Sequence, residues 1–267
     1  RLMVGSEGTL GIITEVTLRL YGIPEAISAA ACTFENLEGA VDTVIQTIQI
    51  GIPIARIELL DDVQMDAINK YSGLDYPAKS TLFLEFHGSD HSVKEQAEMV
   101  QDLASENGGG DFQFATSTED RSKLWQARHD AAHSCNALRP GCVLWATDVC
   151  VPISRLAECI HETKKDLATA SMPAPLVGHV GDGNFHLCFI IDPDKPEEMA
   201  EAQTLNGRLI DRALDMDGTC TGEHGVGLGK IAYMEREHGE GISVMRAIKK
   251  TLDPDNIMNP GKIISMN

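Results

Sequence analysis

The chain is poor in positive charge and has no long apolar run. Its 22 lysines and arginines stand against 40 aspartates and glutamates, which gives a formal net charge of −18. A nucleic-acid binder needs a basic face to neutralise phosphates, and an anionic lipid surface attracts basic segments, so we expect neither as a partner. No apolar run approaches the roughly 18 residues of a membrane span, so we expect no membrane-spanning helix.

Paired cysteines are also missing from the pattern. The seven cysteines are odd in number and form no Cys-x-x-Cys motif. Most lie among apolar residues, which predicts buried, reduced thiols in a reducing compartment. Hydrophobic residues make up 43% of the 267 residues and charged residues 23%. This composition is ordinary for a globular protein with a packed core.

Strand and helix patterns alternate along the chain. The predicted strands lie near residues 28–34, 54–62, 80–88, 111–117, 143–151 and 175–192. Long amphipathic helices between strands that are not uniformly apolar favour an α+β fold, in which helices pack on a mostly antiparallel sheet. The order of elements suggests two ferredoxin-like halves. Apolar residues from Ile13 to Leu20 predict one more strand without visible neighbours, so we interpret the chain as the C-terminal part of a longer protein.

One short segment, GHVGDGNFH at residues 178–186, carries two histidines around an Asp-Gly pair. Asp-Gly is a strong hairpin signal, and we place Asp182 and Gly183 at the centre of the turn. His179 then faces His186, with Cβ atoms about 4.5–5.5 Å apart, so both imidazoles reach one metal ion. The alternative is a hairpin with two ordinary histidines bonded to the main chain.

A third ligand is expected in GTCTGEHGVGLGK, residues 218–230, where the glycines let the backbone approach another group closely. Adjacent residues of an extended segment point opposite ways, so Glu223 and His224 should address different partners. Glu223 with the two histidines forms a set suited to Zn²⁺, Mn²⁺ or Fe²⁺ and leaves His224 free as a base. The alternative is a solvated Glu-His pair in a flexible loop.

An arginine stands out on the helix predicted over residues 118–138. Arg128 falls on an apolar stripe of residues spaced three or four apart. A guanidinium there needs an anionic partner. That partner is either a protein carboxylate such as Asp148 or the carboxylate of a substrate.

Several long motifs together resemble the C-terminal half of FAD-dependent D-lactate dehydrogenases, in the vanillyl-alcohol-oxidase-type family of FAD-linked oxidases. These motifs are VGSEGTLGIITEVTLRL (4–20), RIELLDD (56–62), LFLEFHGS (82–89), TDVCVPISRL (147–156), GHVGDGNFH (178–186), GTCTGEHGVGLGK (218–230) and DPDNIMNPGK (253–262). The resemblance covers essentially the whole chain. It implies a FAD-linked oxidase C-terminal domain: the end of an FAD-binding domain at 1–24, a substrate-binding cap with the metal site at 25–240, and a helix and tail at 241–267 that return to the FAD domain.

The resemblance also implies roles for single residues. The family's metal ligands fall on His179, His186 and Glu223, and its base falls on His224. The family's substrate-binding positions correspond to Arg128 and Asn184. The positions that face the flavin correspond to Ser6, Glu7, Gly8, Thr9, Gly11, Ile12 and Asn259.

The implied activity is oxidation of a D-2-hydroxy acid to a 2-keto acid, with FAD and a divalent metal, Zn²⁺ or Mn²⁺, as cofactors. Members that act on 2-hydroxyglutarate carry a lysine where this chain has Ala146. D-lactate is therefore favoured, while glycolate, one methyl smaller, stays open. A downstream electron acceptor is implied as a partner, and a homodimer is left open. The expected location is a bacterial cytoplasm or, in a eukaryote, the mitochondrion.

Two other functions stay open from the sequence. The same ligand set with His224 as base fits a metal-dependent hydrolase, although VGSEGTLG and MNPGK would then have no role. A non-catalytic acid-binding module is the third interpretation. We expect the isolated chain to hold no flavin and to turn over no substrate.

Overall fold

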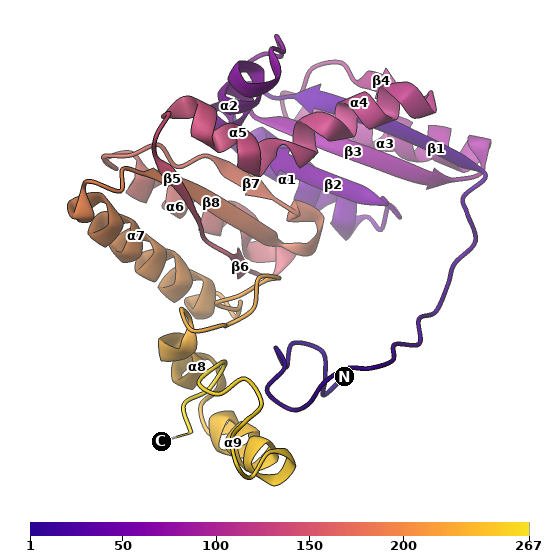
Figure 1. Ribbon diagram of the computed structural model, residues 1–267. Coiled ribbons are helices and arrows are strands. Elements are labelled where there is room, and N and C mark those ends of the chain that lie inside the picture. The colour runs from indigo at the N-terminus through magenta and orange to yellow at the C-terminus, as the bar shows by residue number, and fades with distance from the viewer. Residues whose placement is uncertain (267) are drawn as a thin grey trace.

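A computed structural model describes residues 1–266, and a central sheet with helices on both faces makes up most of it (Figure 1). The first half contains β1 (Ala26–Thr33), α1 (Leu37–Gln49), β2 (Arg56–Leu60), α2 (Asp62–Ser72), β3 (Thr81–Gly88), α3 (Asp90–Glu106) and β4 (Gln113–Ala115). The second half contains α4 (Thr118–His129), α5 (Ala131–Leu138), β5 (Val143–Ala146), β6 (Val149–Cys150), α6 (Leu156–Leu167), β7 (Leu176–Gly178), β8 (Asn184–Ile191), α7 (Pro196–Asp215), α8 (Ile231–His238) and α9 (Gly241–Leu252).

The strand order confirms the predicted α+β class. The strands run β4-β1-β3-β2-β7-β8-β5, with β6 also on β8, and the pairings among residues 1–266 are antiparallel. The first half therefore has the ferredoxin-like order 4-1-3-2. The second half repeats the order 1-3-2 as β5-β8-β7. Its fourth strand is reduced to one bridge between Cys150 and Thr219, after which the glycine-rich loop begins.

Two cores stabilise the sheet. Helices α1, α3, α6 and α7 bury apolar side chains such as Val44, Val100 and Leu209 on one face, in the larger cluster. Helices α2, α4 and α5 cover the other face, where Met65 and Trp125 pack in the smaller cluster. Figure 1 shows this second layer running across the sheet from α4 to α2. The candidate residues for chemistry lie at the border of this second face.

The single helix predicted over 118–138 is wrong, because it is two helices that meet at Asp130. The bend lets α4 pack on β1 and β4 while α5 packs on α2 and β8. One straight helix could not pack on both of these surfaces. Helix α8 was not predicted, since it is short and starts without a side-chain cap.

The strand predicted between Ile13 and Leu20 is also wrong for the described chain. Residues 12–24 run as an extended, unpaired segment, with Leu20 87% and Ile23 94% exposed. Residues 1–11 then lie beside α8 and α9, so the two ends of the chain meet below the sheet (Figure 1). Among residues 1–266 no helix has both the length and the apolar composition needed to cross a bilayer.

Candidate active site

The histidine hairpin forms with a register different from the predicted one. Val177 pairs with His186, so His179 does not face His186 across the ladder. The turn is longer than two residues, because residues 180–182 form a 3₁₀ turn that Gly183 closes at a φ of +80°. A Cβ on Gly183 would also lie 2.0 Å from a backbone oxygen, so this position requires glycine.

The two histidines nevertheless lie close together, with ring centroids 6.2 Å apart. Strand register explains why two carboxylates flank them. Leu59 pairs with Gly178, so Glu58 occupies the next position opposite His179. Val149 pairs with Phe185 in β6 and β8, which places Asp148 opposite His186. The sheet thus brings these four polar residues to neighbouring positions in two adjacent rows, with Glu58 opposite His179 and Asp148 opposite His186.

His179 is oriented by a buried carboxylate. Its Nδ1 donates to Glu58 Oε1 at 2.7 Å, and this hydrogen bond raises the pKa of His179. Arg128 donates from Nε and Nη2 to Glu58 Oε2, at 3.2 and 3.1 Å. The anionic partner of Arg128 is therefore a protein carboxylate, but it is Glu58 and not Asp148. Nε2 of His179 is left directed toward Glu223, with 3.5 Å between Nε2 and Oε1.

His186 is the most buried histidine of the cluster, with a side chain 7% exposed. Its Nδ1 lies 3.0 Å from the carbonyl oxygen of Thr147, so Nδ1 carries the proton and donates it. Burial lowers the pKa of His186, which favours the neutral ring. Its buried Nε2 makes no hydrogen bond within residues 1–266, although Glu223 Oε1 lies 3.0 Å away. In the neutral ring with its proton on Nδ1, Nε2 presents a lone pair to a carboxylate oxygen.

The glycine-rich loop brings Glu223 and His224 to the same place, which contradicts the expectation that they address different partners. The His224 ring stacks on His186, with centroids 4.7 Å apart and planes 5° apart. Its Nε2 lies 3.5 Å from Glu223 Oε1. The loop turns sharply here instead of running extended. One carboxylate oxygen is consequently surrounded by three imidazoles, and Glu223 and His224 remain about half exposed.

Asp148 causes that turn. Its buried carboxylate accepts from the backbone N–H groups of Glu223 and His224, at 3.1 and 3.0 Å. It also accepts from Thr221 Oγ1 at 2.7 Å and from Lys230 Nζ at 3.2 Å. Burial alone would raise the pKa of Asp148, but these donors outweigh burial and hold it well below its usual range.

Asn184 supports the same carboxylate. Its Nδ2 donates to Asp148 Oδ1 at 2.8 Å and to the Val149 carbonyl at 2.9 Å. Its Oδ1 is buried and has no hydrogen-bond partner among the described residues. Gly222 packs directly on this amide, because a Cβ there would lie 1.9 Å from Asn184 Nδ2.

Within the part of the chain that the structure describes, His179, His186 and Glu223 each offer one ligand atom, and these atoms lie within 4.8 Å of one another. Asp148, His186 and His224 form a second such group. The first group suits a cation better, since the lone pairs of Asp148 are already occupied by N–H and O–H donors. Divalent transition metals bind readily to such imidazole and carboxylate sets.

The residues expected at a flavin lie near the two ends of the described chain. They are Ser6, Glu7, Gly8, Thr9, Gly11, Ile12 and Asn259, of which Ile12 is 78% exposed. Asn259 Nδ2 donates to the Glu7 carbonyl. The buried Lys249 donates to the carbonyls of Thr9 and Met258, at 2.8 and 2.7 Å. These contacts fix the N-terminal segment against the C-terminal tail.

Glu7 connects these residues to the histidine site. Its carboxylate accepts from the backbone N–H groups of Val226 and Gly227, at 2.7 and 2.9 Å. Gly225 must be glycine at this contact, because its φ is +83° and a Cβ would lie 2.6 Å from Glu7 Oε1. The loop with Glu223 and His224 is thus held on one side by Asp148 and on the other by Glu7.

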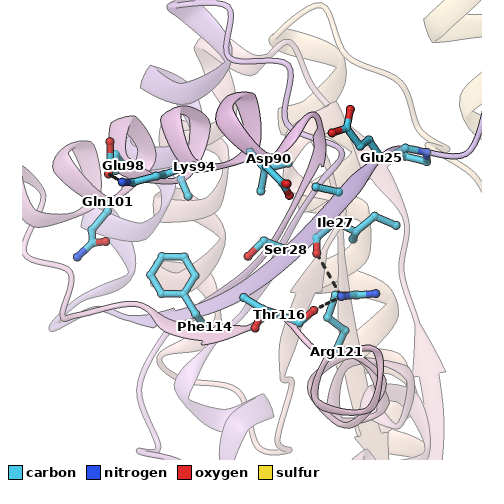
Figure 2. Close-up of a pocket in the computed structure, with 14 residues that line it drawn as sticks. Glu25, Ile27, Ser28, Asp90, Lys94, Glu98, Gln101, Phe114, Thr116 and Arg121 are labelled. Carbon is cyan, nitrogen blue, oxygen red and sulfur yellow. Dashed lines mark hydrogen bonds and ion pairs between the residues drawn. The ribbon is translucent and has the colours of Figure 1, made fainter.

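A cavity of about 720 Å³ lies away from this site, between α3, β1, β4 and the start of α4. Figure 2 shows its two basic groups already engaged, with Lys94 beside Glu98 and Arg121 on the carbonyls of Ile27 and Thr116. None of the residues expected to act in chemistry lines it. We therefore place the candidate active site at the histidine cluster.

Sequence reasoning missed Glu58 and Lys230, and it named Asp148 only as a partner for Arg128. A signal existed for Glu58, since this acid lies between the apolar residues Ile57 and Leu59 at the centre of β2. For Asp148 the signal was an acid in the middle of a predicted apolar strand. That strand is interrupted at Thr147 and Asp148, between β5 and β6.

Known proteins resemble this chain over almost its whole length. Over 266 residues the chain is 53% identical to a protein named probable D-lactate dehydrogenase, mitochondrial, from Danio rerio, covering 99% of this chain and 54% of that protein. A D-lactate dehydrogenase (cytochrome), mitochondrial, from Arabidopsis thaliana is 49% identical over 265 residues, covering 99% and 47%. Glycolate oxidase subunit GlcD from Bacillus subtilis is 34% identical over 268 residues, covering 99% and 57%. The chain spans about half the length of these relatives.

Solved structures share the fold at low identity. A 4-ethylphenol oxidase from Gulosibacter chungangensis superposes with a TM-score of 0.68 at 17% identity, covering 92% of this chain and 55% of that chain. An alkyldihydroxyacetonephosphate synthase gives 0.60 at 19%, covering 96% and 48%. Residues 23–263 match the family described as FAD linked oxidases, C-terminal domain. The chain therefore belongs to the FAD linked oxidases, as a C-terminal domain of that family.

Proposed function

We propose that this chain is the substrate- and metal-binding half of a flavin-dependent D-2-hydroxy-acid dehydrogenase that oxidises D-lactate to pyruvate. One observation carries the proposal: the buried Nε2 of His186 has no hydrogen bond within residues 1–266 and lies 3.0 Å from Glu223 Oε1. The lone pair of a neutral imidazole and a carboxylate oxygen repel at that distance unless a cation lies between them. A divalent ion held by His179, His186 and Glu223 fits this geometry.

The proposed metal is Zn²⁺ or Mn²⁺, since both accept imidazole and carboxylate ligands. Once bound, the ion would act as a Lewis acid that polarises the carboxylate and 2-hydroxyl of the substrate. His179 and His186 suit the ligand role because each donates its Nδ1 proton to an oxygen of the protein and presents Nε2 to the site.

His224 is proposed as the base that takes the 2-hydroxyl proton. Its side chain is 48% exposed, so a substrate can reach it, and stacking on His186 fixes its ring. A positioned base of this kind contributes typically about 10²–10⁴ in rate. Oxidation also removes a hydride from C2, and a bound flavin would supply that redox chemistry. Asn184 and Arg128 are proposed to border the substrate. Two of the five N–H donors of Arg128 are bonded to Glu58. The Asn184 amide is bonded to Asp148 and to the Val149 carbonyl.

We further propose that residues 1–24 and 241–267 face an FAD-binding domain around the cap at 25–240. Ser6, Glu7, Gly8, Thr9, Gly11, Ile12 and Asn259 would form that contact. The exposed apolar side chains of residues 12–23 support it, because a soluble protein rarely leaves such a run uncovered. The hydrolase alternative loses its support, since the matched family is one of FAD linked oxidases.

D-lactate is preferred over 2-hydroxyglutarate because Ala146 offers no charge to a second carboxylate. Glycolate remains the second candidate substrate, and a relative named glycolate oxidase subunit supports keeping it. Relatives named mitochondrial and cytochrome-linked support a mitochondrial location and a cytochrome as the downstream electron acceptor.

The test compares His186→Ala with His87→Ala in a flavoprotein that contains this chain. His87 pairs with Glu85 on β3 and serves as the matched control. Replacing a residue that only orients a metal ligand already lowers metal affinity or activity about 10–100-fold. We therefore expect His186→Ala, which removes a ligand itself, to lower kcat/KM for D-lactate at least about 100-fold. Chelation should abolish wild-type turnover, and added Mn²⁺ or Zn²⁺ should restore it. Unchanged turnover after chelation and in His186→Ala would refute the metal role.

A further inference from the structure

Glu58 bridges two residues that the sequence assigned to different tasks. Its Oε1 accepts from the proposed metal ligand His179 at 2.7 Å. Its Oε2 accepts from Arg128 Nε and Nη2, at 3.2 and 3.1 Å. Each carboxylate oxygen thus holds one neighbour in place.

We propose that Glu58 is a positioning residue of the metal site and that Arg128 acts on the metal through it. The inference rests on the proposed function, because it assumes that His179 is a ligand. Glu58 keeps the proton of His179 on Nδ1, which leaves Nε2 as the lone pair that faces Glu223. Arg128 in turn keeps Glu58 in the rotamer that reaches His179.

The fold makes this contact rigid. Glu58 lies in the middle of β2, between β3 and β7, and only 9% of its side chain is exposed. Antiparallel register puts it directly opposite His179. Arg128 approaches from α4, in the helical layer on that face, and 16% of its side chain is exposed. A strand, a strand end and a helix therefore meet at one carboxylate.

Charge also favours the arrangement. An unpaired buried carboxylate is unfavourable, and two N–H groups of the guanidinium satisfy one of its oxygens. Two of the five N–H donors of Arg128, one on Nε and one on Nη2, are consequently used inside the protein. An arginine that served the substrate alone would have its Nε and Nη2 free for a ligand.

The experiment measures metal affinity of the 267-residue chain with no substrate present. Mn²⁺ binding is followed by electron paramagnetic resonance and Zn²⁺ binding by competition with a chromogenic chelator. We expect Glu58→Gln to weaken both about 10–100-fold, as for other carboxylates that orient a metal-bound histidine. Arg128→Lys should weaken them in the same direction, because one ammonium cannot replace the paired N–H groups. Glu85→Gln, which alters the His87–Glu85 pair on β3, should leave both affinities unchanged.

A second readout needs no metal. Nitrogen-15 shifts of the histidine rings should show His179 as the Nδ1–H tautomer in the wild type and as a mixture in Glu58→Ala, with circular dichroism confirming that the variant folds. Wild-type metal affinity in both Glu58→Gln and Arg128→Lys, or an unchanged His179 tautomer in Glu58→Ala, would overturn the inference. Failure of the wild type to bind either ion would instead refute the proposed metal function, while the tautomer measurement still decides the role of Glu58.

Discussion

Asp148 is expected to hold the glycine-rich loop, residues 218–230, in place, and Asp148→Asn tests this. The variant keeps the size of the side chain but removes the charge that faces Lys230 and two backbone N–H groups. Asp148 is 1% exposed and the Lys230 side chain 15%, so the lysine charge would stay buried without its partner. Breaking a buried pair on one side costs about 3–5 kcal/mol. We therefore expect the free energy of unfolding to fall by about 3 kcal/mol or more.

The measurement is urea unfolding at pH 7, followed by circular dichroism, with a chelator present so that bound metal does not contribute. Asp211→Asn is the control, because Asp211 pairs with Arg236 at the surface, where such pairs contribute at most about 1 kcal/mol. A loss below about 1 kcal/mol for Asp148→Asn would refute the reasoning.

Acid provides an independent check of the same idea. The folded-state pKa of Asp148 is lowered, so its contribution to stability is complete above the unfolded value of about 3.9 and is lost as the pH falls toward the folded value. The stability difference between wild type and Asp148→Asn should therefore be constant from about pH 5 to 8 and should narrow below about pH 4. A difference that grows on acidification would contradict this assignment.

Three further predictions concern packing and thiol chemistry. Gly222→Ala should lower the free energy of unfolding by about 1–3 kcal/mol in the same assay, because its Cβ would lie 1.9 Å from a buried amide nitrogen. The control Gly229→Ala, whose Cβ would have no atom within 4 Å, should change that free energy little. Leu209 is 1% exposed in the larger core, so Leu209→Ala should lower the free energy of unfolding by about 2–5 kcal/mol and lower the melting temperature with it. A loss below about 1 kcal/mol would mean that neighbouring side chains fill the cavity. Iodoacetamide at pH 8 should label the partly exposed Cys142 before the buried Cys32, because burial raises the pKa of the Cys32 thiol to about 12. Mass spectrometry that showed the reverse order would contradict the packing.

Apolar periodicity was enough to predict the class of fold, because each strand and helix of the sheet layers carries its own pattern. The first half follows the 4-1-3-2 order that the alternation of elements suggests. The hairpin register could not be read in the same way. A Cβ on Gly181 would lie 2.5 Å from Ile57 Cγ2, so the turn is shaped partly by packing on a distant strand.

The prediction that Glu223 and His224 point in opposite directions was wrong for a similar reason. The rule that neighbours point opposite ways holds for extended backbone, but the carboxylate of Asp148 binds both of their N–H groups and turns the chain. That acid lies 75 residues before Glu223 in the sequence. Local pattern therefore identified the histidines and Glu223 of the site, but neither Glu58 and Lys230 nor the way in which the side chains face one another.

The contact between Glu7 and the loop has a consequence for how the protein folds. The carboxylate and the Val226 N–H that it binds are separated by 219 residues. Contacts between such distant positions pay a large chain-closure entropy before they gain any energy, so they form after the local hairpins and helices. We therefore expect the loop that carries His224 to be ordered at a late step, after residues 1–11 have come to lie against it.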